Sequence, residues 1–200
     1  MGLCGCILFH RILVDNKKRK ETEMIRLTAM SKTKTASAVN IKMLTLAAIF
    51  AAMTFAVTAF VHIPTAKGYI HIGDAVIFIA ACLLPKPYAI AAAAIGGSLS
   101  DAVSGYWIWV PATFAVKGLT VLAFTAKKPK MICARNLTAL VPALVLCVGG
   151  YGLYSGLVIY GSLPAGFLDA PANIFQIAAS AAVFIALGMT MDKAGIKKKL

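Results

Sequence analysis

The stretch GDAVIFIAACLLP, residues 73–85, and the stretch GGSLSDAVSGYWIWVPATFAVKGL, residues 96–119, decide how this chain folds. Both are apolar enough to lie in a bilayer, yet Asp74, Asp101 and Lys117 sit inside or at the edge of the apolar runs. An ionisable group in a bilayer costs at least about 2.5–3.5 kcal/mol on insertion scales, so such residues usually pair, line a pathway or bind a ligand. We therefore expect these side chains to have one of those roles.

The rest of the chain has the same apolar character. Hydrophobic residues make up 60% of the 200, and the mean hydropathy is +0.83. Soluble domains are roughly half apolar, so this composition indicates an all-α integral membrane protein with one compact domain.

Six apolar segments account for that domain. They cover residues 43–61, 70–84, 88–103, 111–126, 137–160 and 171–189. A helix of 15 residues spans only about 22 Å, less than the ~30 Å of the hydrocarbon core. The second and third segments are therefore short helices, helices that extend into the interface, or the two arms of a re-entrant hairpin. In each case their outer ends emerge on the same side, so the topology of the later segments is unchanged.

Basic residues mark one side of this bundle. Eighteen of the 20 lie in residues 1–42, at Lys86, in residues 127–135 or in residues 193–199. The other loops hold only Lys67. Because cytoplasmic loops carry excess Lys and Arg, we expect six crossings of a bacterial plasma membrane with both termini cytoplasmic. The net charge of +13 flanks apolar runs instead of forming a soluble basic module, which argues against nucleic-acid binding.

The expected domain organisation follows from the same pattern. Residues 1–41 form a basic, disordered cytoplasmic tail, residues 42–192 the six-helix membrane domain, and residues 193–200 a second basic tail. Met24 and Met30 are both plausible starts, so residues 1–23 could be a start-site artefact.

Asp74 and Lys117 are expected at similar depths in two helices. Counting from the outer ends of their segments, about four and six residues in, both lie some 6–10 Å below the surface. Opposite charges at matching depth form a natural pair, which removes most of the insertion cost. Such a pair either locks two helices together or forms the polar floor of a substrate cavity.

Other polar and aromatic residues gather near the same face. Trp107 and Trp109 are typical of an interfacial aromatic belt, or stack on a flat heterocyclic ligand. Asn173 and Gln176 share a helix face, where their amides either bind a ring with mixed polar edges or join two helices.

Three further features are less specific. Asp101 precedes Gly105, which ends the third helix, so the favoured interpretation is that Asp101 caps or orders that turn. His62 and His71 flank the first outer loop, and a lone His there is usually solvated. Tyr154 lies in a glycine-rich part of the fifth segment, and we include it among the substrate-binding candidates.

The first segment carries alanines at four-residue spacing, among them Ala48 and Ala52. Small residues at this spacing form helix-docking faces in membranes. The strip either packs within the chain or docks a partner membrane protein.

Motifs for catalysis are missing. The sequence has no Walker A loop, no HExxH and no nucleophile elbow. From the first apolar segment to the end of the sixth, the only acids are Asp74, Asp101 and Asp169, and the cysteines have no zinc-like spacing. We therefore expect no catalytic residues, no metal and no bound cofactor.

Taken together, several motifs resemble the S components of energy-coupling factor transporters, small membrane proteins that capture vitamins. The resemblance covers roughly residues 43–190 and rests on Gly73-Asp74, the Leu-Leu-Pro at 83–85, GGSLSD, SGY, Pro-x-Thr at 111–113 and Lys-Gly-Leu at 117–119. The Ala48 and Ala52 strip is similar to the family's docking motif, and residues 173–176 resemble the polar start of its sixth helix.

The resemblance implies a mechanism. The protein would capture a small molecule in an outward cavity under the 62–69 and 104–110 loops. It would then reorient in a complex with a membrane T component and two ATP-binding subunits, which alone use ATP. The substrate stays open among riboflavin, thiamine precursors, other B vitamins and modified bases. The alternative is a stand-alone permease or channel.

Overall fold

The computed structural model describes residues 18–24, 40–64 and 69–199. The chain divides into two units, residues 1–40 and 41–200. In the first, residues 18–24 form a helix, and most of the expected tail lies outside the described residues. All other elements belong to the second unit.

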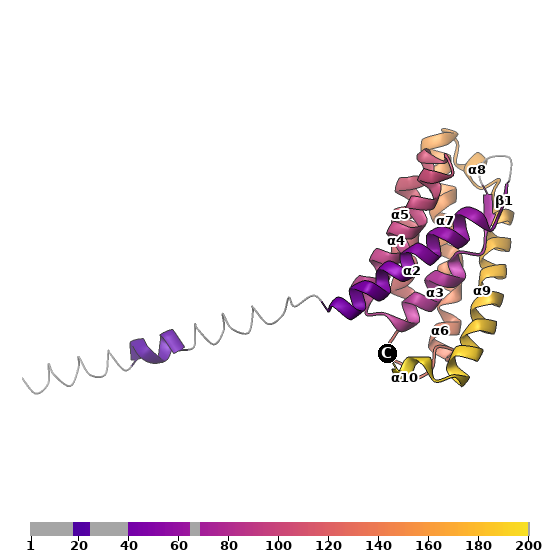
Figure 1. Cartoon of the computed structure of the whole chain (residues 1–200). Coiled ribbons are helices and arrows are strands. Elements are labelled where there is room, and N and C mark those ends of the chain that lie inside the picture. Colours follow the sequence, from indigo (N-terminus) through magenta and orange to yellow (C-terminus); the bar gives the residue numbers. More distant parts are fainter. Residues whose placement is uncertain (1–17, 25–39, 65–68, 200) are drawn as a thin grey trace, which may run out of the picture. The chain divides into compact units, whose positions relative to one another are not determined.

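The second unit is built mainly from helices (Figure 1). The longer ones are α2 (Ile41–Phe60), α3 (Asp74–Leu83), α4 (Lys86–Val103), α5 (Val110–Ala123), α7 (Leu140–Tyr154) and α9 (Ala170–Lys193). The shorter ones are the 3₁₀ turn η1 (Trp107–Trp109), α6 (Ala134–Thr138), the π-helical turn η2 (Ser155–Ile159), α8 (Leu163–Gly166) and α10 (Ile196–Lys199). Each of the six expected apolar segments is thus mostly helical.

Among the described residues, three stretches are long and apolar enough to cross a membrane. They are Ile41–Phe60, Ala134–Ile159 and Leu163–Lys193, while Asp74–Leu83 and Trp107–Ala123 are shorter apolar helices. Large apolar side chains are also exposed along the helices, for example Leu99 on α4 and Val145 on α7. Such a surface suits lipid and would promote aggregation in water. The chain is therefore a helical membrane protein.

A small hairpin interrupts the helical pattern. Strand β1 (His62–Pro64) pairs antiparallel with β2 (Tyr69–His71), with His62 opposite His71. The prediction of a helix from residue 70 is wrong at its start, because residues 70 and 71 belong to β2 and α3 begins at Asp74. Apolar content alone cannot separate a short strand from a helix turn.

The core forms around α3, which packs against α2, α4, α5 and α9. Nine of its ten residues, 74–82, are buried. Phe78 stacks on Phe124 at 4.9 Å between ring centroids, and Phe184 of α9 meets Phe78 edge-on at 5.9 Å. A helix that is buried on all sides has an almost continuously apolar sequence, and the sequence of α3 after Asp74 is of this kind.

Small residues allow α2 and α4 to approach closely. A Cβ added to Gly96 would lie 2.5 Å from the carbonyl oxygen of Ala51, so only glycine fits there. As expected, α4 ends near Gly105, whose φ of 85° is readily adopted only by glycine.

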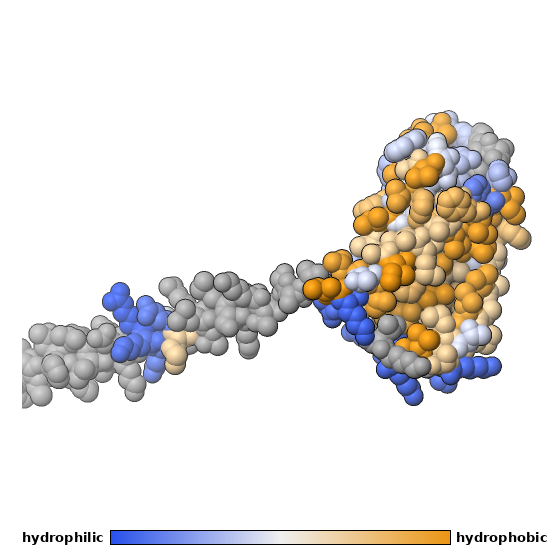
Figure 2. Space-filling model, viewed as in Figure 1, coloured by the Kyte–Doolittle hydropathy of each residue, from blue (hydrophilic) through white to orange (hydrophobic). Residues whose placement is uncertain are grey.

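The two ends of this unit differ. The hairpin end carries β1 and α8, and the opposite, basic end carries α6 and α10 (Figure 1). Between them Figure 2 shows a mostly apolar surface, with strongly hydrophilic residues gathered at the basic end.

Candidate functional site

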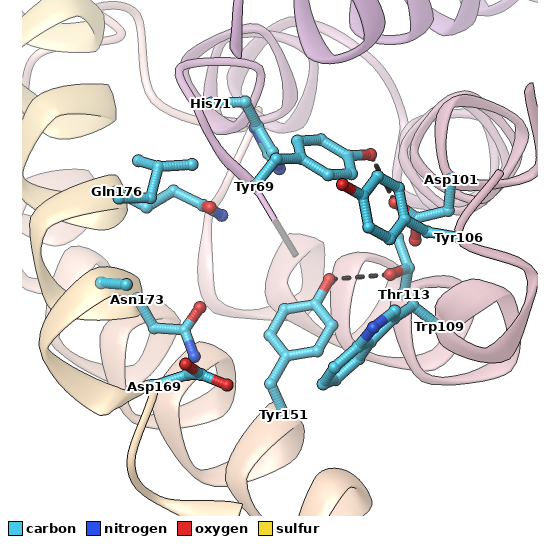
Figure 3. A pocket seen from close by; sticks show the side chains of 12 residues that line it. Tyr69, His71, Asp101, Tyr106, Trp109, Thr113, Tyr151, Asp169, Asn173 and Gln176 are labelled. Atoms are coloured by element: carbon cyan, nitrogen blue, oxygen red, sulfur yellow. Dashed lines mark hydrogen bonds between the residues drawn. The ribbon is translucent and has the colours of Figure 1, made fainter. Parts of the chain in front are cut away.

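A cavity opens at the hairpin end and encloses about 570 Å³ of space, part of it open to solvent. Its lining comes from β2, α4, α5, α7, α9 and the segment around η1 (Figure 3). The lining residues are Tyr69, Ile70, His71, Asp101, Tyr106, Trp109, Thr113, Tyr151, Asp169, Ala172, Asn173 and Gln176.

The cavity has two unlike sides. Four aromatic rings gather on one, with Tyr69 and Tyr106 5.0 Å apart and Trp109 and Tyr151 5.8 Å apart between centroids. On the other side lie the polar side chains of Asp169, just before α9, and of residues 173 and 176 in α9 (Figure 3). Aromatic faces can stack on a flat ring, and amides can pair with its polar edges.

A buried ion pair lies beside the cavity. Lys117 Nζ of α5 is 2.6 Å from Asp74 Oδ1 of α3, and the two side chains are 2% and 1% exposed. The other oxygen, Asp74 Oδ2, accepts a hydrogen bond from Gln176 Nε2 of α9 at 2.8 Å. The ammonium also lies 5.5 Å from the centroid of the Tyr151 ring. The expected pair is present, and Gln176 links it to the cavity.

The position of Asp74 differs from the expected one. It is the first residue of α3, not the fourth or fifth, because the helix starts later than predicted. A carboxylate suits the first turn, where backbone N–H groups lack helical partners. The preceding Gly73 packs against α2 so closely that an added Cβ would overlap Thr58 Oγ1, at 2.0 Å. The Gly-Asp sequence therefore brings α3 against α2 and aims the carboxylate into the bundle.

Asp101 joins α4 to the hairpin. Its Oδ1 accepts a hydrogen bond of 2.5 Å from the Tyr69 hydroxyl. Burial and the nearby Asp101 charge raise the pKa of Tyr69, so this hydroxyl stays protonated and donates. The second oxygen, Oδ2, is buried without a hydrogen-bond partner among the described residues. Asp101 thus has the expected ordering role, which it exerts on the hairpin through Tyr69. It also lines the cavity, where its Oδ2 can accept a hydrogen bond from a ligand.

A further hydrogen bond of 3.0 Å holds two lining residues in place. It joins the hydroxyls of Thr113 and Tyr151 (Figure 3). This contact fixes the tyrosine ring against α5.

The prediction that His71 is solvated is wrong. Its side chain is buried, and its Nδ1 accepts a hydrogen bond of 3.1 Å from the backbone N–H of Gly73. Burial, with the positive charge of Lys117 as the next cause, lowers the pKa of His71 from 6.5 to about 3. The neutral imidazole thus connects the hairpin to the start of α3.

This histidine makes stability depend on pH. Below pH 6.5 the unfolded chain binds a proton at His71 that the folded chain excludes, so stability is complete above pH 6.5 and falls toward pH 3. At pH 5.5 the expected loss is about 1.4 kcal/mol. Thermal unfolding of the detergent-solubilised protein at pH 7.5 and 5.5 measures it. The variant His71→Gln keeps an acceptor that does not titrate, and an equal pH dependence in this variant would contradict the prediction.

The structure brings some predicted site residues together and separates others. Trp109, Asn173 and Gln176 line the cavity, whereas Trp107 is 69% exposed and does not. The hydroxyl of Tyr154 donates to the Ile108 carbonyl at 2.6 Å and is absent from the lining.

The two predicted docking residues lie elsewhere. Ala48 and Ala52 are exposed on α2, while their neighbour Ala47 is buried. They form part of the outer surface of the helix bundle.

Sequence reasoning missed several lining residues: Tyr69, Ile70, His71, Tyr106, Thr113, Tyr151, Asp169 and Ala172. Tyr151 and Tyr154 lie three residues apart on one helix face, so spacing could not choose between them. Tyr106 and Trp109 share the same short segment, and its aromatic richness was the available signal. The tyrosine and histidine of β2 could be found only by predicting the hairpin.

The cavity offers no cluster for a metal. Within residues 18–24, 40–64 and 69–199, no three His, Cys, Asp or Glu side chains are arranged to hold one. Its polar chemistry consists of hydroxyls, amides, an imidazole and two carboxylates.

Comparison with known families places most of the chain in a described family. The model of the family described as ECF-type riboflavin transporter, S component, matches residues 38–193. That range contains α2 to α9 and the whole cavity lining. No curated protein matches the chain.

Proposed function

The chain belongs to the S component family of ECF-type riboflavin transporters, and we propose on that premise that its cavity captures riboflavin or a vitamin of the same flat, uncharged kind. The resemblance to S components is thereby confirmed, and the protein is a vitamin-transport subunit and not an enzyme. The observation that carries the substrate proposal is the cavity with aromatic rings on one side and α9 amides on the other (Figure 3).

The two sides match the parts of a flavin. Its planar ring system can stack on the rings of Trp109 and Tyr151, as heteroaromatic rings stack on aromatic side chains. One edge of that ring alternates N–H donors and carbonyl acceptors. Asn173 and Gln176 present groups of both kinds, because an amide donates and accepts at once.

The charges of the cavity favour a ligand without negative charge. Asp101 and Asp169 line it, and Lys117, the cation beside it among the described residues, is paired with Asp74. The free Oδ2 of Asp101 would accept from a hydroxyl such as those of the ribityl chain. A phosphate at that position would meet a carboxylate and be repelled. We expect riboflavin to bind more tightly than riboflavin 5′-phosphate.

Two tryptophans provide a matched test. Trp109→Ala should weaken riboflavin binding about 5- to 150-fold, because stacking on an aromatic side chain contributes about 1–3 kcal/mol. Trp107→Ala removes an exposed ring two residues away and should leave the affinity unchanged. Quenching of flavin fluorescence on titration with the purified protein measures both. Equal losses in the two variants, or unchanged binding in Trp109→Ala, would place the ligand elsewhere.

We also propose the finer features of the transport cycle. The helices would make six crossings of a bacterial plasma membrane with both termini in the cytoplasm, so that the cavity opens outward. The gathering of basic residues at the end away from the cavity supports this orientation, because positive loops stay cytoplasmic. The subunit would then dock on a T component driven by two ATP-binding subunits. The exposed positions of Ala48 and Ala52 support a docking face there.

A further inference from the structure

A second cavity lies at the basic end and is distinct from the vitamin pocket. It encloses about 1400 Å³, much of it open to solvent. The loop before α6, the start of α6, the end of α9 and α10 enclose it. Its lining residues are Lys128, Pro129, Lys130, Cys133, Ala134, Arg135, Asp192, Gly195, Lys197 and Lys198.

Positive charge dominates this lining. Five basic residues face a single acid, Asp192, which leaves a net four positive charges. Both oxygens of that acid are already used, because Oδ1 accepts from the Met131 N–H at 2.8 Å and Oδ2 from the Ile132 N–H at 2.9 Å. Asp192 therefore holds the loop in place and does not pair with the lysines.

One of these lysines is held in an unusual way. Lys197 Nζ is buried and has no hydrogen-bond partner among the described residues. Burial lowers the pKa of Lys197, because the nearby negative charge of Asp192 does not fully offset the ammonium's loss of hydration. Lysines that serve only to orient a membrane protein can extend into water. A buried ammonium beside other cations instead calls for an anion.

The helix that ends at this cavity also carries exposed apolar side chains. Leu187 and Met189, within two turns of Asp192 on α9, are 46% and 48% exposed. A free phosphate would use only the charged part, whereas a phospholipid would place its headgroup among the lysines and its acyl chains along α9. Basic pockets beside transmembrane helices bind anionic headgroups in this way.

We propose that the cavity at the basic end binds the phosphate of an anionic phospholipid headgroup, with Lys130 and Lys197 as its principal contacts. The site is independent of the proposed vitamin function, since it shares no lining residue with the vitamin pocket.

The test uses the full-length protein in nanodiscs of phosphatidylcholine with increasing phosphatidylglycerol. Thermal unfolding reports stabilisation, and native mass spectrometry counts retained phosphatidylglycerol. We expect Lys130→Gln and Lys197→Gln each to weaken phosphatidylglycerol binding about fivefold, as for loss of one cation near an anionic headgroup. Lys127→Gln is the matched control, because Lys127 is exposed on the same loop but outside the lining.

Stabilisation by phosphatidylglycerol but not by phosphatidylcholine, lost selectively in the two lining variants, supports the proposal. Equal loss in Lys127→Gln would show general surface attraction and overturn it. Equal stabilisation by millimolar inorganic phosphate would show that the anion comes from solution, and would overturn the lipid assignment. A cooperative thermal unfolding transition in phosphatidylcholine alone shows that the variants fold.

Discussion

Replacing Asp74 with asparagine is expected to lower the stability of the bundle by about 3–5 kcal/mol, because it leaves the buried ammonium of Lys117 without a counter-charge. The change is nearly isosteric, so lost packing contributes little. Gln176 also loses the charged acceptor of its 2.8 Å hydrogen bond, and its orientation toward the cavity relaxes. We expect riboflavin binding to weaken strongly even where the protein still folds. The melting temperature in detergent should fall by at least about 6 °C.

Replacing Lys117 alone, and replacing both residues together, separates the effect of charge on stability from the effect of side-chain shape. Lys117→Met should be similarly destabilising, since it leaves a buried carboxylate instead. The double variant Asp74→Asn, Lys117→Met should be more stable than either single variant, because no unpaired charge remains. Asp169→Asn removes a half-buried carboxylate at the cavity that has no cation partner among the described residues, and serves as the control. Additive losses in the double variant, or wild-type stability and affinity in Asp74→Asn, would show that the pair is unimportant.

The ion pair shows how far sequence reasoning can reach. Two opposite charges in apolar segments have few partners available. The free-energy cost of leaving either charge unpaired in the bilayer is therefore enough to predict that Asp74 pairs with Lys117, 43 positions later. Gln176 was predicted either to contact a ligand or to join two helices, and it both lines the cavity and donates to Asp74 of α3. Residues that are expensive to bury are thus the most predictable part of this molecule.

The rest of the site depends on geometry that the sequence pattern does not carry. Tyr69 and His71 reach the cavity only because residues 62–71 form a hairpin, and a three-residue strand has no detectable period. Trp107 and Trp109 have the same chemistry and similar surroundings in the sequence. The 3₁₀ turn points one of them into the cavity and leaves the other exposed, and that difference appears only in the folded structure.

The alanine strip raises the question of how binding leads to uptake. We expect Ala48→Trp or Ala52→Trp to leave riboflavin affinity unchanged and to reduce cellular uptake at least about tenfold. Both residues are exposed on α2 and contribute nothing to the cavity lining, so a larger side chain does not disturb the pocket. A bulky side chain would prevent the close helix approach that small residues permit. Flavin fluorescence measures binding, and accumulation of labelled riboflavin in cells measures uptake.

The control must be an equally exposed position on a helix away from α2. Leu187 of α9 is 46% exposed, and Leu187→Trp should retain uptake because it changes a surface outside the proposed docking face. The purified subunit alone in liposomes should bind riboflavin without transporting it, since transport would require the T component and the ATP-binding subunits. Uptake retained in both alanine variants would remove the docking face, and transport by the subunit alone would favour a stand-alone permease. Loss of uptake with retained binding is the combination that only a docking surface explains, because a defect in the pocket or in folding would reduce both.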